Sequence, residues 1–397
     1  MAALFLSSRL RGDGARLIFL PILAVVSGIL AWSSEPRLLP VAFLFPALWA
    51  FAPSRFGAAL VSAGYFLAAS RGLLQGVANY YGGGFAAAIG LWFGAASAFV
   101  FVHGALWTVR PGGGKALRYA LAAVLMAVPP FGIVGWAHPI TAAGAVFPGG
   151  GWWGLLAAAI GLLAMTTKRW PIAILTLGGF WIWSAATWTV PMLPEGWIGV
   201  ETRFGGSTGE YAGYRQQLET IDLVRAAADG GAKVVVLPEG AAGAWTPTVE
   251  RMWHKALSNV EVSVIAGAII VTEAGYDNVL LDITELGASV LYRQRVPVPV
   301  SMWQPWQRHA GESGGARAYF FSNPVVDFGG LRAAPLICYE QLLIWPILQS
   351  ALFSPDVIVA VGNGWWTANT NIVAIQTEAV EAWARLFSVP PLESFNT

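Results

Sequence analysis

The sequence predicts a polytopic α-helical membrane domain over residues 1–194, followed by a water-facing α/β domain over residues 195–397. Hydrophobic residues make up 56% of the chain and charged residues only 11%, whereas about a quarter of the residues of a typical soluble protein are charged. The charge is also divided unevenly. Residues 1–194 carry eleven Lys or Arg against two Asp or Glu, and residues 195–397 carry twelve against twenty. The two parts therefore suit different solvents.

The first part contains about seven apolar stretches, at 17–33, 38–53, 56–75, 84–108, 117–136, 147–166 and 171–190. A helix needs about 20 residues to cross the hydrocarbon of a bilayer, and most of these stretches come close to that length. In lipid they must be helical, because no water is available to the backbone polar groups. The stretch 38–53 is the shortest. Seven such stretches in succession disfavour the alternative of helices buried in a large soluble core.

Positive charge in the loops predicts the orientation of these spans. If the N-terminus is cytoplasmic, the inside segments hold nine Lys or Arg and the outside segments hold two. An odd number of spans then places residues 195–397 in the periplasm, with the chain anchored in the bacterial inner membrane. The net charge of this outer part, −8, argues against nucleic-acid binding, which needs clustered Lys and Arg.

The outer part mixes strands and helices along its length. We expect strands at 197–201, 232–240, 262–271 and 356–363, hairpins at 278–295 and 318–340, and helices at 209–230 and 371–387. Such a mixture over about 200 residues favours one α/β domain whose sheets are covered by helices. The segment 301–317 is rich in Gly and polar residues and is the expected mobile loop.

Cys338 is the only cysteine of the chain and follows a short apolar run, at the end of an expected buried strand. Open α/β folds place their reactive groups at such strand ends. A free cysteine is also among the most frequently buried residue types, so the local context leaves a nucleophile and a small core residue equally open. A single cysteine excludes an internal disulfide.

Glu239 is the expected base for this thiol. It ends the strand at 232–240, where partial desolvation raises the pKa of a carboxyl toward the range useful for proton transfer. Taken by itself, an acidic residue after a strand is more simply explained as the start of a loop. No pair among the four His residues has the spacing of metal ligands, and no Cys–His signature accompanies them, so neither a metal nor a cofactor is expected.

The motifs VVVLPEG (234–240) and ICYE (337–340), after seven spans, resemble the apolipoprotein N-acyltransferase branch of the nitrilase (carbon-nitrogen hydrolase) superfamily. The resemblance implies an α-β-β-α sandwich with a Glu-Lys-Cys triad, whose Cys takes an acyl chain from a membrane phospholipid and passes it to a lipoprotein amine. It assigns the base to Glu239 and the nucleophile to Cys338. Glu340 matches the Glu after the family's Cys-Tyr pair, and Asn363 begins a segment like the family's N-D-x-W loop.

The lysine of that triad does not carry over. In LYRQRVPVPVSMW (291–303), Gln294 occupies its position, with Arg293 and Arg295 on either side. Neighbouring side chains on a strand point to opposite faces, so both arginines should face away if Gln294 faces the site. A one-residue bulge could redirect either arginine and make it a substitute. Loss of one preorganised oxyanion donor typically lowers the rate by a factor on the order of 10²–10³.

The C-terminal part is expected to be shortened, because family members continue after the helix at 371–387 through further strands and an eighth span. The combination of seven spans, a shortened nitrilase-like domain and no lysine resembles the conjugal transfer proteins of Ti-type plasmids. This resemblance implies a role beside conjugation-machinery components, with weak or absent N-acyltransferase activity. An active Cys-dependent acyltransferase or amidase, forming a thioester on Cys338, is the alternative. A transporter is a third reading, which the near absence of ionisable groups within the spans disfavours.

Four tryptophans fall in loops beside the expected site: Trp303, Trp306, Trp365 and Trp366. Indoles favour the membrane–water interface, so these side chains could seat the domain on the bilayer or line an entry for an acyl chain. Ordinary packing in the core explains each of them equally well. We therefore name them, with Asn363, as candidate substrate- or lipid-binding residues.

Overall fold

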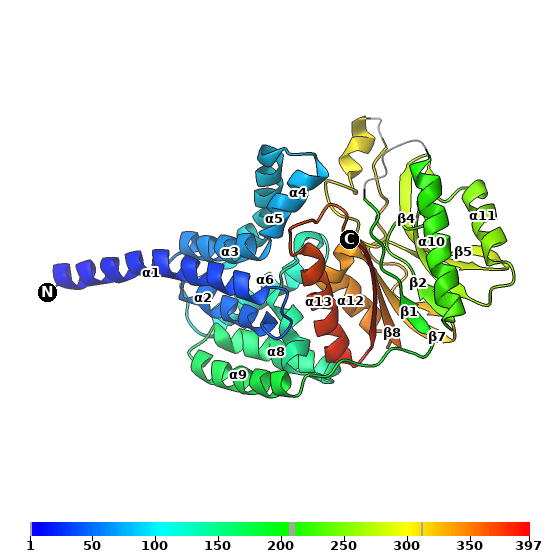
Figure 1. The fold of residues 1–397 in the computed structure, drawn as a ribbon. Helices are drawn as coiled ribbons and strands as arrows, with labels where there is room; N and C mark the ends of the chain where they lie inside the picture. The colour runs from blue at the N-terminus through cyan, green and yellow to red at the C-terminus, as the bar shows by residue number, and fades with distance from the viewer. Residues whose placement is uncertain (1, 206–210, 311–312) are drawn as a thin grey trace. The chain divides into compact units, whose positions relative to one another are not determined.

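The computed structural model describes residues 2–205, 211–310 and 313–397 and divides the chain into two compact units (Figure 1). The first unit consists of Met1–Val190, Leu343–Trp345 and Asn369–Ser388. The second consists of Pro191–Leu342, Pro346–Ala368 and Val389–Thr397. The chain therefore returns to the first unit twice after residue 195.

Among its described residues, the regular elements of the first unit are all helices. Its helices are α1 (Ala2–Ala31), α2 (Phe45–Phe51), α3 (Arg55–Ala69), α4 (Gly72–Tyr80), α5 (Phe85–Leu106), α6 (Gly113–Ala127), α7 (Ala143–Val146), α8 (Gly151–Met165), α9 (Trp170–Ala186) and α13 (Ile372–Phe387). Short 3-10 helices lie at Leu39–Leu44, Phe131–Val134 and Pro139–Ala142. Helices thus form within all seven apolar stretches.

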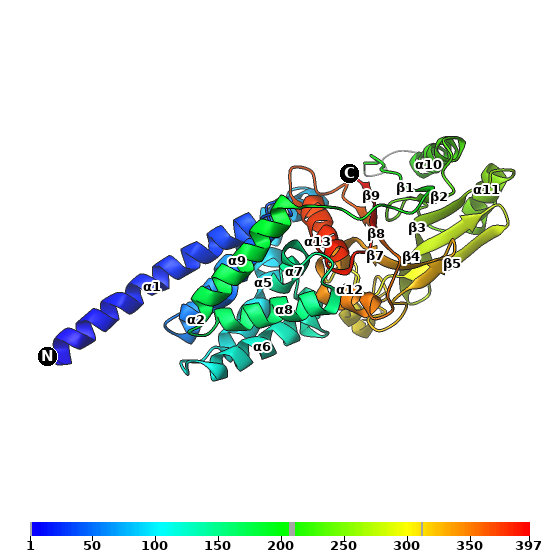
Figure 2. The same cartoon turned by 90° about the horizontal axis from the view of Figure 1, so that it is seen from below.

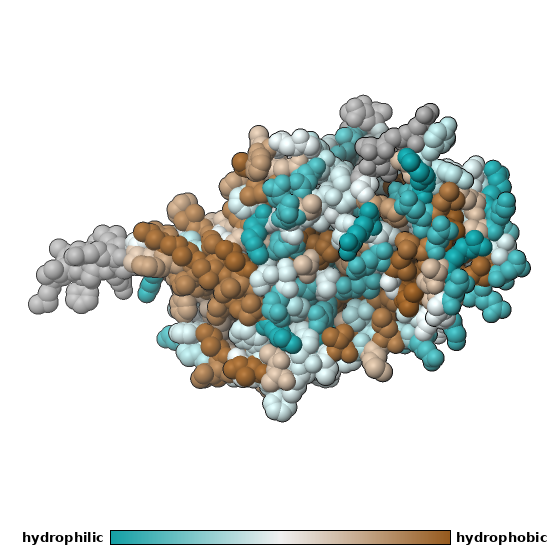
Figure 3. Space-filling model, viewed as in Figure 1, coloured by the Kyte–Doolittle hydropathy of each residue, from teal (hydrophilic) through white to brown (hydrophobic). Residues whose placement is uncertain are grey.

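Only some of these helices are long and apolar enough to cross a membrane. Among the described residues, Asp13–Ala31 and Phe85–Leu106 are, and α3 with α4 adds a third if this pair, bent by 56°, counts as one span. Large hydrophobic side chains are exposed over α1 and α9, including Phe19, Ile22, Leu175 and Ile182 (Figure 3). Large apolar side chains exposed in this number need a lipid or protein partner. The seven spans stay a prediction.

Glycines allow close helix packing in this unit. A side chain at Gly28 of α1 would lie 2.4 Å from the carbonyl oxygen of Tyr65 in α3. A side chain at Gly144 of α7 would lie 1.7 Å from the carbonyl oxygen of Ala382 in α13. Small residues at helix interfaces let two backbones approach in this way. Gly144 thus lets α13, which follows β8 (Val357–Asn363) in sequence, pack within the helical unit.

The second unit contains two sheets. The first sheet has the order β1-β2-β3-β4-β5, with β1 to β3 parallel and β3 to β5 antiparallel. The second has the order β6-β7-β8-β9, with β6 and β7 antiparallel and β7 to β9 parallel. The strands are β1 (Trp197–Gly199), β2 (Val234–Val236), β3 (Ser263–Thr272), β4 (Gly275–Thr284), β5 (Gly287–Arg293), β6 (Val326–Phe328), β7 (Leu331–Ile337), β8 (Val357–Asn363) and β9 (Pro391–Asn396).

The two sheets pack face to face. One buried cluster joins Val236, Ile265 and Leu280 of the first sheet to Val359 and Leu392 of the second. Helices α10 (Ala212–Asp229) and α11 (Pro247–Leu257) cover the outer face of the first sheet (Figure 2). The strand ends that carry Glu239 and Cys338 therefore belong to two facing sheets.

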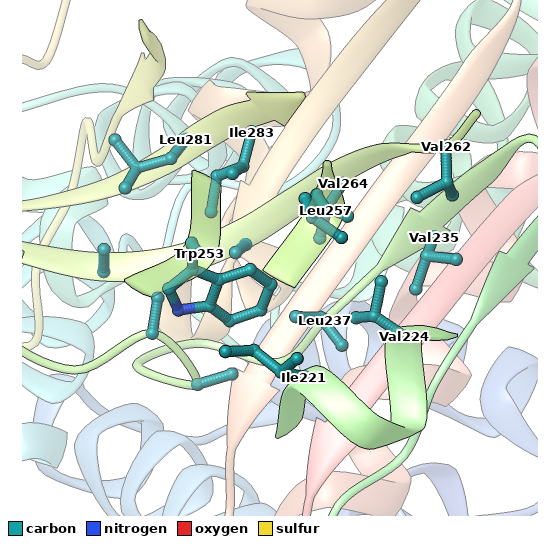
Figure 4. Packing of buried hydrophobic residues seen from close by; sticks show 14 of the residues in the cluster. Ile221, Val224, Val235, Leu237, Trp253, Leu257, Val262, Val264, Leu281 and Ile283 are labelled. Carbon is teal, nitrogen blue, oxygen red and sulfur yellow. The ribbon is translucent and has the colours of Figure 1, made fainter. Parts of the chain in front are cut away.

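Trp253 of α11 is at the centre of the outer core, against residues of β3, β4 and α10 (Figure 4). Its indole N–H donates to the side-chain oxygen of Gln217 at 2.7 Å, so the buried polar end of the ring is satisfied. α11 begins after Thr246, whose hydroxyl accepts from the Val249 amide. The Thr-Pro pair at 246–247 thus explains where this helix starts.

One expectation about the C-terminal half needs correction. The segment after the helix at 371–387 forms β9 and extends the second sheet, although no further strand was expected there. Two consecutive prolines conceal this strand in the sequence, but Pro391 is its first residue, where a missing N–H is tolerated. The segment 301–317 contains a 3-10 helix at Pro305–Ala310 and bridges Trp303 to Gly315, while residues 311–312 lie outside the described residues.

Candidate active site

Cys338 sits at the turn between β7 and the 3-10 helix Cys338–Leu342. Its φ of +51° is in the left-handed region, which non-glycine residues rarely adopt and which recurs at functional sites. The side chain is 8% exposed. The strand end and the strained turn together present the thiol at the carboxyl edge of the second sheet.

Glu239 follows β2 and is buried beside the thiol. Burial raises the pKa of Glu239 to about 7, and hydrogen bonds from the Asn278 amide, the Cys338 thiol and the Asn363 backbone oppose that rise. The Asn278 side-chain nitrogen donates to the Glu239 carboxylate at 2.6 Å. A side chain at Gly267 would lie 2.5 Å from the Glu239 Cα, so this glycine gives the Glu239 turn its place against β3. Glu239 is thus positioned to accept the thiol proton.

Gln294 joins Glu239 to the cysteine turn through a chain of neutral amides. The Asn278 nitrogen donates to the Gln294 side-chain oxygen at 2.9 Å, and the Gln294 nitrogen donates to the Ile337 carbonyl at 3.1 Å. Gln294 has no exposed surface. The residue at the expected lysine position therefore supplies hydrogen bonds but no positive charge.

Arg295 is buried and directed to other partners. Its Nε donates to the Tyr292 hydroxyl, Nη1 to Pro346 and Gln349, and Nη2 to Pro335 and Ser350. These bonds use all five N–H groups of the guanidinium. Arg295 thus has no donor left for an oxyanion.

Arg293 points to yet another group. Its Nε donates to the Asp277 carboxylate at 3.2 Å. A register shift lies between Leu280 and Leu281, where β4 pairs with Tyr292 and Val290 and leaves Leu291 unpaired. This bulge precedes Arg293, and the side chains of Arg293 and Arg295 bond to other groups instead of replacing the lysine beside Glu239 and Cys338. The structure therefore gives both candidate substitutes other roles.

Glu340 supports the turn that carries the thiol. Its buried carboxylate accepts from the backbone N–H groups of Arg295, Val296 and Ile337 and from the Tyr292 hydroxyl. Burial raises the pKa of Glu340, and the charge of Arg295 with these hydrogen bonds opposes the rise. Glu340 thus fastens the end of β5 to the end of β7.

The model of the carbon-nitrogen hydrolase family matches residues 58–196 and 255–385. The chain belongs to the carbon-nitrogen hydrolase family. It is 54% identical to the conjugal transfer protein TraB of Agrobacterium fabrum over 98% of this chain and 95% of that protein. It is also 54% identical to a probable conjugal transfer protein TraB of Sinorhizobium fredii, over 98% of this chain and all of that one.

Solved structures of the carbon-nitrogen hydrolase family are more distant. An amidase of the nitrilase superfamily from Nesterenkonia matches with 12% identity and a TM-score of 0.37, over 52% of this chain and 79% of that one. A carbon-nitrogen hydrolase from Helicobacter pylori matches with 14% identity and a TM-score of 0.35, over 50% of this chain and 72% of that one.

Asn278 is the residue of this carbon-nitrogen hydrolase site that the sequence did not reveal. It lies within β4 and is 2% exposed, with both side-chain N–H groups engaged. One signal was available: two polar residues, Asp277 and Asn278, directly precede the apolar run at 279–281. Polar side chains inside a strand are expected to have a partner, but the sequence does not show which.

The structure separates the four candidate tryptophans. Trp365 lines a cavity with Asn363, and the Trp366 indole donates to the Asn363 carbonyl at 3.1 Å. Trp303 packs edge-on against Phe320, with ring centres 5.4 Å apart, and Trp306 is half exposed. Asn363, Trp365 and Trp366 therefore lie next to the Glu239 environment, while Trp303 and Trp306 are not among the recorded lining residues of that cavity. Within the described part of the chain, no three His, Cys, Asp or Glu gather as metal ligands.

Proposed function

We propose that this carbon-nitrogen hydrolase family member acts in plasmid conjugation as an inner-membrane protein and has weak or absent N-acyltransferase activity. The role in conjugation is supported by 54% identity to two TraB proteins over nearly the whole chain. Its partners would be membrane phospholipid and components of the conjugation machinery. A lipoprotein substrate belongs to the alternative activity considered below.

The observation that carries the low activity is the neutral amide chain from Glu239 through Asn278 and Gln294 to Ile337. When Glu239 takes the thiol proton, the buried pair keeps one negative charge, on sulfur instead of oxygen. A buried charge without a paired cation is costly, and Gln294 offers only a neutral donor in place of the family's lysine. We expect the loss of a charged donor to lower the rate by at least 10²–10³-fold, on the order of the effect of losing a neutral one.

Placement in the inner membrane is supported by the two or three helices of sufficient length and hydropathy and by the exposed apolar side chains of the helical unit. The positive charges of the sequence favour a cytoplasmic N-terminus and a periplasmic hydrolase unit. All seven apolar stretches would then be membrane-embedded, with the shorter ones packed among the longer.

The test joins two measurements. Purified protein is incubated with phospholipid and its intact mass is recorded, with Cys338→Ala as the control. In parallel, donor cells that lack the gene are complemented with either form, and the conjugation frequency is measured. We expect no acyl adduct and equal complementation by both forms. If the native protein restores the conjugation frequency of these donor cells and the Cys338→Ala form does not, the proposal is refuted.

An active Cys-dependent acyltransferase or amidase is the second candidate. It is favoured by the raised pKa of Glu239, about 7, by the hydrogen bond between this carboxyl and the Cys338 thiol, and by the strained backbone of Cys338. This enzyme would carry a thioester on Cys338 and transfer the acyl group to a lipopeptide amine. Appearance of that adduct, followed by its transfer, would establish the second candidate over the first.

A further inference from the structure

Arg385 of α13 is a buried cation with few partners. It is 2% exposed, and its Nη2 donates to the Ser184 hydroxyl of α9 at 3.0 Å. Nε and Nη1 are also buried, yet neither has a hydrogen-bond partner among the described residues. Since Nε carries one N–H and Nη1 carries two, most donors of this guanidinium are unused. Buried donors are normally paired, so this arrangement requires an acceptor from outside the described residues.

Within the described part of the chain, no carboxylate forms an ion pair with this guanidinium. Glu381, one turn earlier on α13, accepts instead from the Trp188 indole N–H at 2.7 Å. Glu378, two turns earlier, is buried, and burial raises its pKa to about 8, so this carboxyl is largely neutral at pH 7. Burial also lowers the pKa of Arg385 to about 10, against the attraction of Glu381, which leaves the guanidinium charged at pH 7. A buried charge without a contacting partner is costly.

Trp188 and Arg37 complete the surroundings of this charge. The Arg385 Cζ lies 3.2 Å from the centre of the Trp188 ring, and the Arg37 Cζ lies 5.8 Å from the same ring. Arg37 is exposed, and its charge also lowers the pKa of Arg385, so the two cations repel each other. Trp188 follows the end of α9 and is partly exposed, so its ring can turn away from the guanidinium without moving a helix. An anion between the two arginines would replace repulsion by attraction.

The apolar surface of α9 leads up to these charges. Ser184 of α9 holds the guanidinium, and its neighbours Ile182 and Trp183 are 71% and 70% exposed. Ile172 and Leu175, further back along the same helix, are exposed as well. A ligand with an anionic head at Arg385 therefore has an apolar surface beside it for a hydrocarbon chain.

We propose that Arg385 and Arg37 bind the phosphate group of a ligand, and that Trp188 turns aside to admit it. An oxyanion accepts from the unused N–H groups and also neutralises the buried charge, whereas a water molecule would do only the first. Phosphate suits the site, because a guanidinium can pair with two of its oxygens at once. Two sources share this chemistry: the head group of a membrane phospholipid and free inorganic phosphate. Because neither Cys338 nor Glu239 takes part, binding here does not depend on acyl transfer.

Binding is measured with the full-length protein in an uncharged maltoside detergent and a phosphate-free buffer. The midpoint of thermal unfolding is followed against the concentration of dioctanoyl phosphatidylglycerol, dioctanoylglycerol or inorganic phosphate, with chloride at equal ionic strength as the blank. If the source is a lipid, phosphatidylglycerol should bind at least about tenfold more tightly than dioctanoylglycerol and than inorganic phosphate. If the source is free phosphate, inorganic phosphate should raise the midpoint and the acyl chains should add no affinity.

Arg385→Met removes the charge and keeps an apolar stem, so we expect the affinity for the phosphate ligand to fall about tenfold or more. Arg215→Met is the matched control, because it makes the same change at an exposed arginine of α10. Trp188→Ala leaves both cations in place. Binding no longer has to displace the stacked ring in this variant, so the affinity for the same ligand should rise about tenfold.

Equal affinities in Arg385→Met and Arg215→Met would overturn the proposal. The proposal also fails if phosphatidylglycerol binds no more tightly than dioctanoylglycerol and inorganic phosphate leaves the midpoint unchanged. If Arg385→Met does not fold, Trp188→Ala decides: an affinity equal to or below that of the native chain would contradict a phosphate site beneath the indole.

Discussion

Glu239 is buried in a setting of neutral hydrogen-bond donors, and its protonation must therefore be linked to folding. Its pKa rises from 4.5 to about 7 on burial, so the folded protein holds a proton there that the unfolded chain has released. The free energy of unfolding should then fall as the pH rises from about 4.5 to about 7, by about 3 kcal/mol in total. The carboxyl is thus kept at a cost in stability.

Replacing this carboxyl should remove that linkage. We expect Glu239→Gln to be more stable than the native chain at pH 8, by up to about 3 kcal/mol, and to differ little from it at pH 4. The measurement is denaturant unfolding of the full chain in detergent at both pH values. An equal stability difference at pH 4 and pH 8 would show that Glu239 does not titrate in this way.

Gln294 is the residue at which a missing cation can be restored. A lysine there would stand within reach of the Glu239–Cys338 pair and favour the thiolate, because a nearby opposite charge lowers an acid pKa by about one to three units. We expect iodoacetamide to alkylate Cys338 about tenfold faster in the Gln294→Lys variant than in the native chain at pH 7. Gln294→Met is the control of similar length, and equal rates in the two variants would mean that charge is not what the site lacks.

At the scale of single residues, the sequence predicted which residues form the candidate site but not which hydrogen bonds join them. Glu239 and Cys338 could be paired because each ends an apolar strand, and the structure places them in hydrogen-bond contact. Asn278 could not be found, because its role depends on the pairing of β4 with strands that bring Glu239 and Gln294 to either side. The bracing role of Glu340 was equally hidden, since its partners come from another strand.

Asp277 of β4 ties three pieces of the hydrolase unit together. It accepts from Arg293 of β5 and from Arg317 and Tyr319 of the following segment. Burial disfavours the charged form, but these partners outweigh it and hold the pKa of Asp277 below its ordinary value of 3.8. Stability from this group is therefore present above about pH 4 and is lost as the pH falls through the lowered pKa of the folded state.

We expect Asp277→Asn to lower the free energy of unfolding by about 1–3 kcal/mol at pH 7, because hydrogen bonds to a charged group are lost, and by less at pH 3. Asp327→Asn is the matched control. Asp327 is exposed and lies 3.8 Å from Arg332, a surface pair whose loss should cost about 0–1 kcal/mol. Both free energies of unfolding are measured in urea at pH 7. An equal loss in the two variants would contradict a stabilising role for the hydrogen bonds of Asp277.

Strands and helices could be predicted where apolar residues form a continuous run or recur at regular spacing, as in the regions of β3, β8 and α13. β9 was missed because Pro390 and Pro391 suggest an irregular tail, and only the pairing of β9 with β8 makes the segment a strand. The bend of 56° between α3 and α4 also lies within one continuous apolar stretch. Tertiary pairing and local bends are decided by partners that a single sequence does not display.

At the scale of the whole molecule, the single cysteine makes the membrane topology testable. Cys338→Ala leaves a chain without thiols, into which one cysteine can be placed at a time. In intact spheroplasts, we expect a membrane-impermeant maleimide to label Tyr81→Cys and Lys233→Cys. It should label Arg110→Cys only after the membrane is permeabilised, because the positive charges favour a cytoplasmic position for that loop. Labelling of Arg110→Cys in intact spheroplasts would reverse the orientation.

The charges of the sequence predict one division near residue 195, whereas the structure has a helical unit and a unit built on two sheets, each made of several separate segments of the chain. Composition could not assign Asn369–Ser388 to the helical unit. The segment lies in the more highly charged part of the sequence, yet α13 packs closely against Gly144 of α7. A helix that follows strands in sequence is naturally read as part of their domain. Only backbone proximity shows that it belongs elsewhere.

That return of α13 to the helical unit bears on how such a gene can be divided or recombined. A single break near residue 195 would leave the helical unit without Asn369–Ser388. The fragment that carries the sheets would keep α13, but α13 would lack its neighbours in the helical unit. Neither fragment would then contain all the residues of one compact unit.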